Sequence, residues 1–236
     1  MSFDKNNFMS GYKITEKIKI EEHITFIRIS PINIGLTLRN IFDSLSDMSW
    51  LTQFDEEYTI KDAFQVRTEA TIKYISENII KENDDSITQN SAEYVVSELA
   101  RKSIVNELKY LDIPLAELIK IKDVGNHGFD FYSKNNNDVL IFGESKYLKG
   151  QNAYGKALKG IVEFVNRKQD SSDIIDIDKF CCKKSKENFT KGKKSFAAAF
   201  SSKKDKTENL IKNINKNKEF IELKKYEEII CIAVDI

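Results

Sequence analysis

The chain of 236 residues contains only three cysteines, two histidines and two prolines, and these shortages exclude several kinds of site. Cys181 and Cys182 are adjacent, so the cysteines provide neither a disulfide framework nor a Cys-x-x-Cys zinc site. His23 and His127 do not support a Ser-His or Cys-His nucleophile. The Gly-x-x-x-x-Gly-Lys phosphate loop is also missing, so any ATP-driven step would have to come from a partner.

Long hydrophobic runs are missing as well. No stretch approaches the roughly 18 consecutive apolar residues of a membrane span. The N-terminal sequence MSFDKNNFMS is too polar for a signal peptide. We therefore expect no membrane partner and a location in the reducing cytoplasm. With 41% hydrophobic and 31% charged residues, the chain can bury a substantial core, as one large domain or a domain with an extension.

The most informative stretch is a candidate β-hairpin. Residues 128–132 and 138–147 are rich in aromatic and β-branched residues, and the Ser, Lys and Asn residues between them favour a turn. Glu144 and Lys146 are two apart, so they project to the same face of their strand. Asp130 joins them only if the loop has an odd number of residues, such as 135–137 or 134–138, or contains a bulge. A two-residue loop would move Asp130 to the other face.

These three side chains suit a divalent cation. Asp130 and Glu144 offer the hard oxygen ligands that Mg²⁺ or Mn²⁺ prefers, and Lys146 could orient a water and stabilise charge on a phosphate. The alternative is an ordinary amphipathic hairpin whose Glu-x-Lys forms a surface ion pair worth under about 1 kcal/mol. However, the apolar run 139–142 predicts a strand buried on both faces, and charges that follow such a strand need partners. The pattern therefore favours a catalytic metal site.

Asp130 followed by Glu144-x-Lys146 at the end of an apolar strand resembles the PD-(D/E)XK nuclease superfamily, with Gly128-Phe129-Asp130 in place of its Pro-Asp. Gly143-Glu144-Ser145-Lys146-Tyr147 and the amphipathic helix after it are most similar to the HamA family, the nuclease subunits of the Hachiman anti-phage defence system. The resemblance covers roughly residues 90–235 and is not close over the first eighty. It implies an α/β restriction-endonuclease-like core with a mixed central sheet flanked by helices. It also implies Mg²⁺-dependent deoxyribonuclease activity and a HamB-like helicase as partner.

The superfamily also supplies a further acid from a helix before the hairpin. Apolar residues recur at helical spacing over 92–111, so a helix is expected there. Glu98 is our choice for the extra acid, with Glu93 as the competitor. A surface ion pair between Glu98 and Lys102, four residues apart, explains Glu98 equally well. Gln151 precedes the amphipathic helix expected at 153–167, where the resemblance implies a polar contact to metal-bound water or phosphate. A solvated loop residue is the alternative.

Two regions are distinguished along the chain. Residues 1–88 are expected to form an N-terminal α/β extension that could dock a partner, with a strand at 24–29 and helices at 36–51 and 61–80. Residues 89–236 are expected to form the nuclease core, closed by a strand at 227–235.

Within that core, residues 183–225 are interpreted as a Lys-rich helical insertion. The segment holds 14 lysines against five acidic residues in a chain of zero net charge, which favours contacts with a phosphate backbone. Phe189, Phe196 and Phe200 are interpreted as core anchors of this insertion, with base stacking as the alternative.

Three functions remain open from the sequence. The first is a DNA nuclease that acts as the effector subunit of a defence complex with a helicase. The second is a stand-alone restriction or repair endonuclease of the same superfamily. The third is a catalytically silent nucleic-acid-binding module that keeps the nuclease fold.

Overall fold

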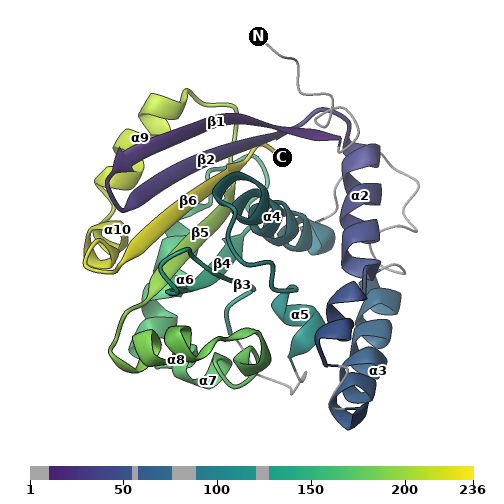
Figure 1. The fold of residues 1–236 in the computed structure, drawn as a ribbon. Helices are drawn as coiled ribbons and strands as arrows, with labels where there is room; N and C mark the ends of the chain where they lie inside the picture. Colours follow the sequence, from purple (N-terminus) through teal and green to yellow (C-terminus); the bar gives the residue numbers. More distant parts are fainter. Residues whose placement is uncertain (1–10, 55–57, 76–88, 121–127) are drawn as a thin grey trace.

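The computed structural model describes residues 11–54, 58–75, 89–120 and 128–236, which form a six-stranded sheet flanked by helices (Figure 1). The strand order is β1-β2-β6-β5-β4-β3. The inner strands run parallel to one another, and the outer strands β1 and β3 run antiparallel to their neighbours. The expected α/β class with a mixed sheet is therefore confirmed. The strands are β1 Tyr12–Glu21, β2 Ile24–Pro31, β3 Phe131–Lys134, β4 Leu140–Lys146, β5 Ser195–Ser201 and β6 Glu228–Val234.

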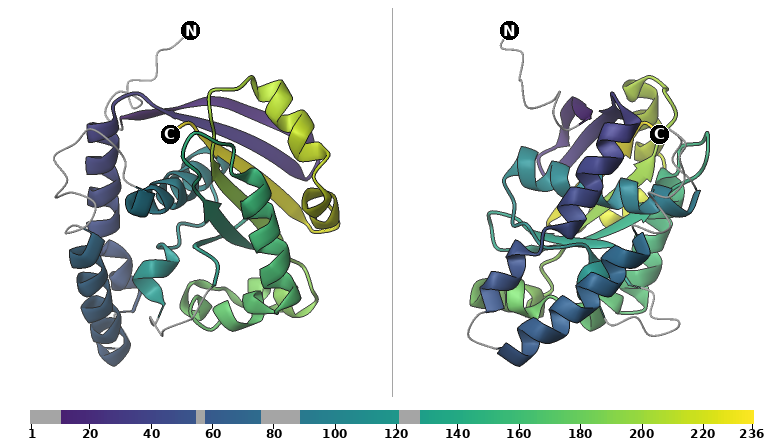
Figure 2. Two further views of the ribbon diagram at one scale, coloured as in Figure 1. Left: turned by 180° about the vertical axis from the view of Figure 1, so that it is seen from behind. Right: turned by 90° about the vertical axis from the view of Figure 1, so that its right-hand side faces the viewer.

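Helices cover both faces of the sheet. Helix α4 crosses one face, whereas α6 lies on the other, as the two opposite views show (Figures 1 and 2). Helices α2 and α3 form a column at one end of the sheet. Among the residues described, no helix is both long and apolar enough to cross a bilayer. The helices are α2 Ile34–Ser46, α3 Tyr58–Ile75, α4 Gln89–Ser103, α5 Ala116–Ile119, α6 Tyr154–Asn166, α7 Gln169–Asp173, α8 Lys183–Thr190, α9 Thr207–Asn215 and α10 Lys218–Leu223, with short turns η1 Ser49–Phe54, η3 Ile104–Leu108 and η4 Asp178–Phe180.

The inner strands are nearly continuous runs of buried residues, because a parallel sheet covered on both faces has no solvent side. Strand β1, at the edge, instead alternates half-buried and exposed residues. The expected strands at 24–29 and 227–235 correspond to β2 and β6, and the expected helix at 153–167 corresponds to α6. The core is thus built around the four inner strands.

Residues 183–225 are not a helical insertion, and that interpretation is wrong. They contain α8, the inner strand β5, α9 and α10. The sequence Ser-Phe-Ala-Ala-Ala-Phe-Ser forms a strand because it lies between α4 and α6, where small side chains let both helices approach. Phe196 and Phe200 are fully buried in the sheet and cannot stack on bases.

The N-terminal strands belong to the same sheet as the rest of the protein. Strand β2 pairs in parallel with β6, from Ile24 opposite Ile229 to Ile29 opposite Val234. The expected boundary at residue 88 lies outside the described residues, as does the end of the helix expected at 61–80. Residues 12–31 are therefore an integral part of the sheet, whereas α2 and α3 are peripheral to it.

The β3–β4 hairpin has the odd loop that the candidate site requires. Phe131 pairs with Gly143 and Lys134 with Leu140. Asp130 lies just before this ladder, and its amide donates to the Gly143 carbonyl at 2.8 Å, next to Glu144. The loop is residues 136–138, one position away from the three-residue loop suggested by the sequence. Asp138 adopts a left-handed conformation with φ 57°, as expected at the end of a three-residue hairpin loop. The odd loop that the sequence set as the condition for Asp130 to join Glu144 and Lys146 is therefore present.

Asn135 fixes this loop. Its Oδ1 accepts hydrogen bonds from the amides of Asn137 and Val139, each at 3.0 Å. Its Nδ2 donates to Glu228 Oε2 at 3.0 Å, which ties the turn to the start of β6. The register of the hairpin is thus held by a buried side chain.

We expect Asn135→Ala to lower the free energy of unfolding by about 2 kcal/mol, because it leaves buried polar groups without partners. Chemical denaturation followed by circular dichroism measures the change. Asn136→Ala, at the exposed neighbouring loop position, is the control and should change stability by less than about 0.5 kcal/mol. Equal effects of both substitutions would contradict the assigned role of Asn135.

Candidate active site

Asp130, Glu144 and Lys146 converge where β4 ends. Lys146 Nζ lies 2.7 Å from Glu144 Oε1. The amide of Ser145 donates a 2.6 Å hydrogen bond to Asp130 Oδ2, so this carboxylate continues the ladder between β3 and β4. The Glu144 side chain is 3% exposed and that of Lys146 is 30% exposed, so the pair lies at the boundary between core and solvent.

Small residues create the space around Glu144. Ala198 of β5 is paired with Glu144 in the sheet, and Gly160 of α6 lies above it. A Cβ atom at Gly160 would lie 2.8 Å from Glu144 Oε1 and about as close to the rest of the carboxyl group. Helix α6 can therefore pack over this carboxylate only because residue 160 has no side chain.

Burial destabilises the charged forms of both carboxyl groups. Burial, and then the charge of Asp130, raise the pKa of Glu144 well above its usual value. Burial also raises the pKa of Asp130, although Lys146 and the Ser145 amide oppose the shift. The charges of Glu144 and Asp130 outweigh burial and raise the pKa of Lys146. Without a cation, Glu144 is the group that keeps a proton, because burial and the charge of Asp130 both raise its pKa.

The raised pKa of Glu144 makes the stability of the protein depend on pH. A carboxyl whose pKa is higher in the folded than in the unfolded state stabilises the fold most when it is protonated. For Glu144 that contribution is present below the ordinary pKa of 4.5 and is lost as the pH rises through the higher folded pKa. The protein without a bound cation thus loses stability at this site on going towards alkaline pH.

The donor set fits a hard divalent cation. Glu144 Oε2 is buried and has no hydrogen-bond partner among the described residues. Asp130 interacts with Glu144, and in the described part of the chain Lys146 is the cation that acts on both carboxyl groups. No cluster of three or more His, Cys, Asp or Glu ligands occurs in the described part of the chain. Two carboxylates suffice for Mg²⁺, which keeps several waters and takes further ligands from substrate phosphates.

Sequence reasoning missed the group that positions Asp130. Asp173 of α7 is buried, and its Oδ2 accepts hydrogen bonds from the amide of Phe129 at 2.9 Å and from the hydroxyl of Tyr132 at 2.7 Å. Lys120 donates to the same oxygen at 2.9 Å and to the carbonyl of Phe129 at 3.2 Å. These contacts hold the backbone of Phe129, directly before Asp130, and the side chain of Tyr132, two residues after it. Asp173 is more than 40 residues away in sequence and no local motif marks it.

The structure does not bring Glu98 to this site. Both Glu98 carboxylate oxygens pair with Arg101 at 2.7 Å, and Oε1 also accepts from Ser44 Oγ at 2.6 Å. Glu98 thus joins α4 to α2, and its partner is Arg101 rather than Lys102. The competing residue Glu93 is the α4 acid whose charge acts on both Asp130 and Lys146. Glu117 of α5 also acts on Asp130.

Gln151 is exposed in the loop between β4 and α6. Its backbone is tied to the loop, since its amide donates to the Leu148 carbonyl at 3.1 Å. Its position beyond Lys146 leaves the expected polar contact as a hypothesis. His127 lies outside the described residues.

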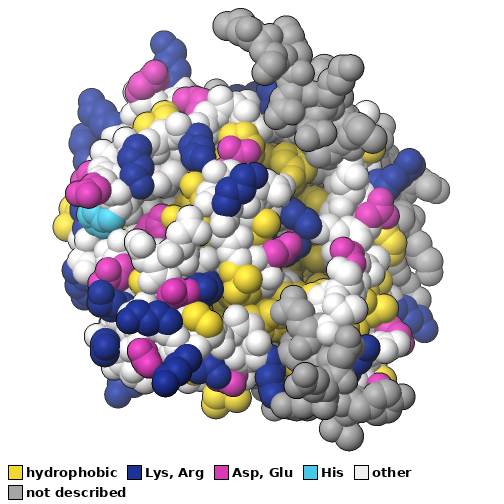
Figure 3. Space-filling view, in the orientation of Figure 1, with side chains coloured by type: hydrophobic (Ala, Val, Ile, Leu, Met, Phe, Trp, Pro, Cys, Tyr) yellow, Lys and Arg dark blue, Asp and Glu magenta, His cyan; other side chains and the backbone are white. Residues whose placement is uncertain are grey.

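A separate pocket of about 190 Å³ lies between α2, η1 and α4. Arg101 and Lys102 line it opposite Asp47 and Asp112, with Leu45, Leu115 and Leu118 on its apolar side. Figure 3 shows the corresponding hollow with hydrophobic side chains in its wall. The Arg101 guanidinium in this pocket is already paired with Glu98 and Asp112. Neither Asp130 nor Glu144 lines the pocket, so it does not coincide with the candidate active site.

We expect Gly160→Ala to lower the affinity for Mn²⁺ about tenfold, because the added methyl group displaces the Glu144 carboxylate. Titration calorimetry measures the affinity, and thermal unfolding checks the fold. Gly155→Ala on the same helix is the matched control. Its Cβ would meet only Asn217 at 3.9 Å, so affinity should be unchanged and stability equal or up to about 1 kcal/mol higher. Wild-type affinity in Gly160→Ala would argue against Glu144 as a ligand.

Comparisons with models of protein families, with curated proteins and with solved structures find no match to this chain.

Proposed function

We propose that this protein is a metal-dependent nuclease that hydrolyses DNA phosphodiester bonds. The observation that carries the proposal is the hairpin geometry, in which the Asp130 carboxylate binds the amide of Ser145, next to Glu144, and Lys146 Nζ lies 2.7 Å from the Glu144 carboxylate. The buried, unpartnered Glu144 Oε2 supports a cation as the missing partner. We also propose that the core is of the PD-(D/E)XK type, because α4 precedes the hairpin and α6 follows it, as the resemblance implies.

In this proposal the two acids bind the metal and the lysine acts on the attacking water and the phosphate. Asp130 and Glu144 would hold Mg²⁺ or Mn²⁺, which supplies Lewis-acid polarisation of the phosphate and a more acidic bound water. Lys146 is held beside Glu144 and is partly exposed, so its ammonium can orient the attacking water and stabilise the charge that builds on the phosphate oxygens. Its raised pKa keeps it in the cationic form that this role requires.

Repulsion between the two buried carboxylates favours the binding of a cation between them. Two carboxylates buried side by side resist ionisation, and a bound cation removes that resistance. The surrounding atoms cannot rearrange to relieve the repulsion, because Gly160 packs against Glu144 and the Ser145 amide fixes Asp130. The site is therefore organised for a cation before one binds.

We expect Glu144→Gln to reduce cleavage of plasmid DNA in Mg²⁺ by at least about 100-fold. The variant keeps the shape of the side chain but cannot ionise to hold a cation. Because Glu144 already keeps a proton in the cation-free protein at neutral pH, the stability of the variant in EDTA should equal that of the wild type. Gel assays measure cleavage, with and without the partner helicase.

Asp138→Asn is the control for this experiment, because Asp138 pairs with Lys134 at the turn of the same hairpin and should be dispensable for cleavage. A folded Glu144→Gln protein that still cuts at the wild-type rate would remove the central claim. A wild type that binds DNA but never cuts would favour the catalytically silent binding module.

We further propose that the nuclease works with a helicase in an anti-phage defence complex and that α2 and α3 dock this partner. This proposal rests on the resemblance and on the peripheral position of the two helices (Figure 1). Val66 of α3 is 68% exposed and offers an apolar contact there. Deleting residues 1–85 would be a poor test, because it removes β1 and β2 from the sheet.

Val66→Asp should therefore weaken binding to the helicase at least about tenfold, since it places a charge in an apolar contact. Surface plasmon resonance measures the affinity. Ile221→Asp on α10 is the control, because Ile221 is 56% exposed at the opposite end of the molecule. Unchanged binding by Val66→Asp would place the docking surface elsewhere or favour a stand-alone nuclease.

A further inference from the structure

Two lysine-bearing loops lie beside the candidate active site, at the carboxyl edge of the sheet. They are residues 147–153 after β4 and residues 202–206 after β5. We propose that these loops, and not the lysines of α8, form the surface that binds the DNA backbone. The proposal rests on the proposed nuclease function. It selects residues 202–206 of the Lys-rich segment 183–225 and adds Lys149 from outside that segment.

Sheet topology places both loops next to Lys146. Strands β4 and β5 are parallel, and Lys146 pairs with Phe200. The chain therefore leaves both strands at the same edge, within one or two residues of this pair. Lys149 belongs to the first loop, and Lys203, Lys204 and Lys206 belong to the second. A phosphate backbone along this edge would pass directly in front of the candidate site.

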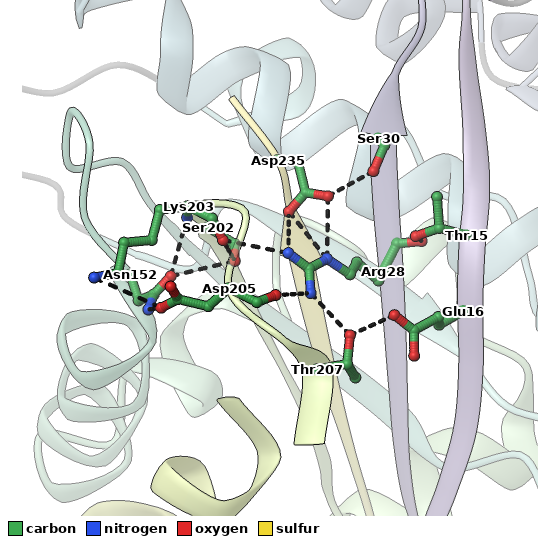
Figure 4. Close-up of polar contacts among 10 residues, drawn as sticks. All are labelled: Thr15, Glu16, Arg28, Ser30, Asn152, Ser202, Lys203, Asp205, Thr207 and Asp235. Carbon is green, nitrogen blue, oxygen red and sulfur yellow. Dashed lines mark hydrogen bonds and ion pairs between the residues drawn. The ribbon is translucent and has the colours of Figure 1, made fainter. Parts of the chain in front are cut away.

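Hydrogen bonds join the two loops into one surface (Figure 4). Asn152 Nδ2 donates to Asp205 Oδ2 at 2.9 Å, while its Oδ1 accepts from the Lys203 amide at 3.0 Å and from Ser202 Oγ at 3.2 Å. The amide of Leu148 donates to Ser201 Oγ at 2.9 Å. The backbone that carries the lysines is thus cross-linked at several points.

Arg28 holds the loop at residues 202–206 through hydrogen bonds to its backbone carbonyls. Its side chain is 6% exposed and forms a bidentate pair with Asp235 after β6. Its remaining donors reach the carbonyl of Asp205 at 2.6 Å and the carbonyl of Lys203 at 3.2 Å (Figure 4). A buried guanidinium that satisfies loop carbonyls keeps the loop in one conformation, which lowers the ordering cost of binding.

The lysines on these loops are largely free of counter-charges. Lys149, Lys204 and Lys206 are exposed, and none has a carboxylate within 4.0 Å among the described residues. Lys203 lies 3.6 Å from Asp205. The other nearby acids are already engaged, since Asp235 pairs with Arg28 and Glu16 contacts Thr207. A rigid surface with unpaired cations is what binding to phosphates requires.

Helix α8 lies at the other end of the hairpin. Asn188 Nδ2 donates to the carbonyls of Asn137 at 3.2 Å and Asp138 at 3.0 Å, so α8 packs on the turn. Strand β4 separates that turn from Lys146 by roughly 20 Å, at about 3.3 Å per residue. The exposed lysines Lys183, Lys184 and Lys191 are therefore far from the candidate site although they belong to the same Lys-rich segment.

Two triple variants with the same change in charge test this assignment. One is Lys149→Gln, Lys204→Gln and Lys206→Gln, and the other is Lys183→Gln, Lys184→Gln and Lys191→Gln. The affinity for a fluorescent 30-base-pair DNA is measured by anisotropy between 50 and 200 mM NaCl, with Ca²⁺ in place of Mg²⁺ to prevent cleavage. The carboxyl-edge variant should lose about 2.7 from the slope of log K against log salt, at about 0.9 per phosphate contact. The α8 variant should keep the wild-type slope.

The outcomes separate the surface from the nuclease proposal. If the wild type cleaves DNA but both variants keep its slope, or both lose it equally, the carboxyl-edge assignment is overturned and the nuclease proposal stands. If the slope falls only in the carboxyl-edge variant and the wild type binds DNA without cleaving it, the proposed binding surface is supported and the proposed nuclease activity is ruled out. A wild type that does not bind DNA overturns both.

Discussion

The register between β3 and β4 is the constraint on which the candidate site depends. Successive residues of a strand point to opposite faces, so a slip by one residue would take Asp130 away from Glu144. The hairpin is held at both ends against such a slip. At the turn, Asn135 binds the loop amides and Glu228, and Tyr110 donates to Glu228 from the other side at 2.9 Å. At the open end, Asp173 binds the Phe129 amide and the Tyr132 hydroxyl.

The contrast among buried acids shows which ones serve the fold. Asp173 and Glu228 each have hydrogen-bond donors, and Asp235 pairs with Arg28, so their burial is compensated. Glu144 is as deeply buried, yet one oxygen has no partner among the described residues and a second carboxylate adjoins it. Natural sequences tolerate such an arrangement where function requires it, because it lowers stability.

Local pattern predicted those parts of the structure whose signal is local. The inner strands β2 and β6 are rich in Ile, and the hairpin has a polar turn between two apolar runs, so their existence could be derived. The parity of the hairpin could not, because it depended on a loop length that the sequence left open. Strand β5 could not be derived, because three consecutive alanines favour a helix in isolation and become a strand only between α4 and α6. The choice between Glu98 and Glu93 depended on how α4 is rotated against the sheet. Arg101 and Ser44, which hold Glu98, decide that rotation. Asp173 had no local signal at all.

The polar residues at the amino and carboxyl edges of the parallel strands differ in what they bind. At the amino edge, Glu228, Tyr110 and Asn135 satisfy one another and close the fold. Ligands of open α/β sheets generally bind at the carboxyl edge. Here Arg28 and Asn152 form hydrogen bonds to the loop residue Asp205, so these two side chains stabilise the loop and are not available to a ligand. The exposed lysines of those loops lie beside two buried carboxyl groups whose cationic neighbour is Lys146. In the nuclease that we propose, a phosphodiester bridged by a cation would contact the lysines and the carboxylates at once, which neither a free cation nor a free phosphate could do alone.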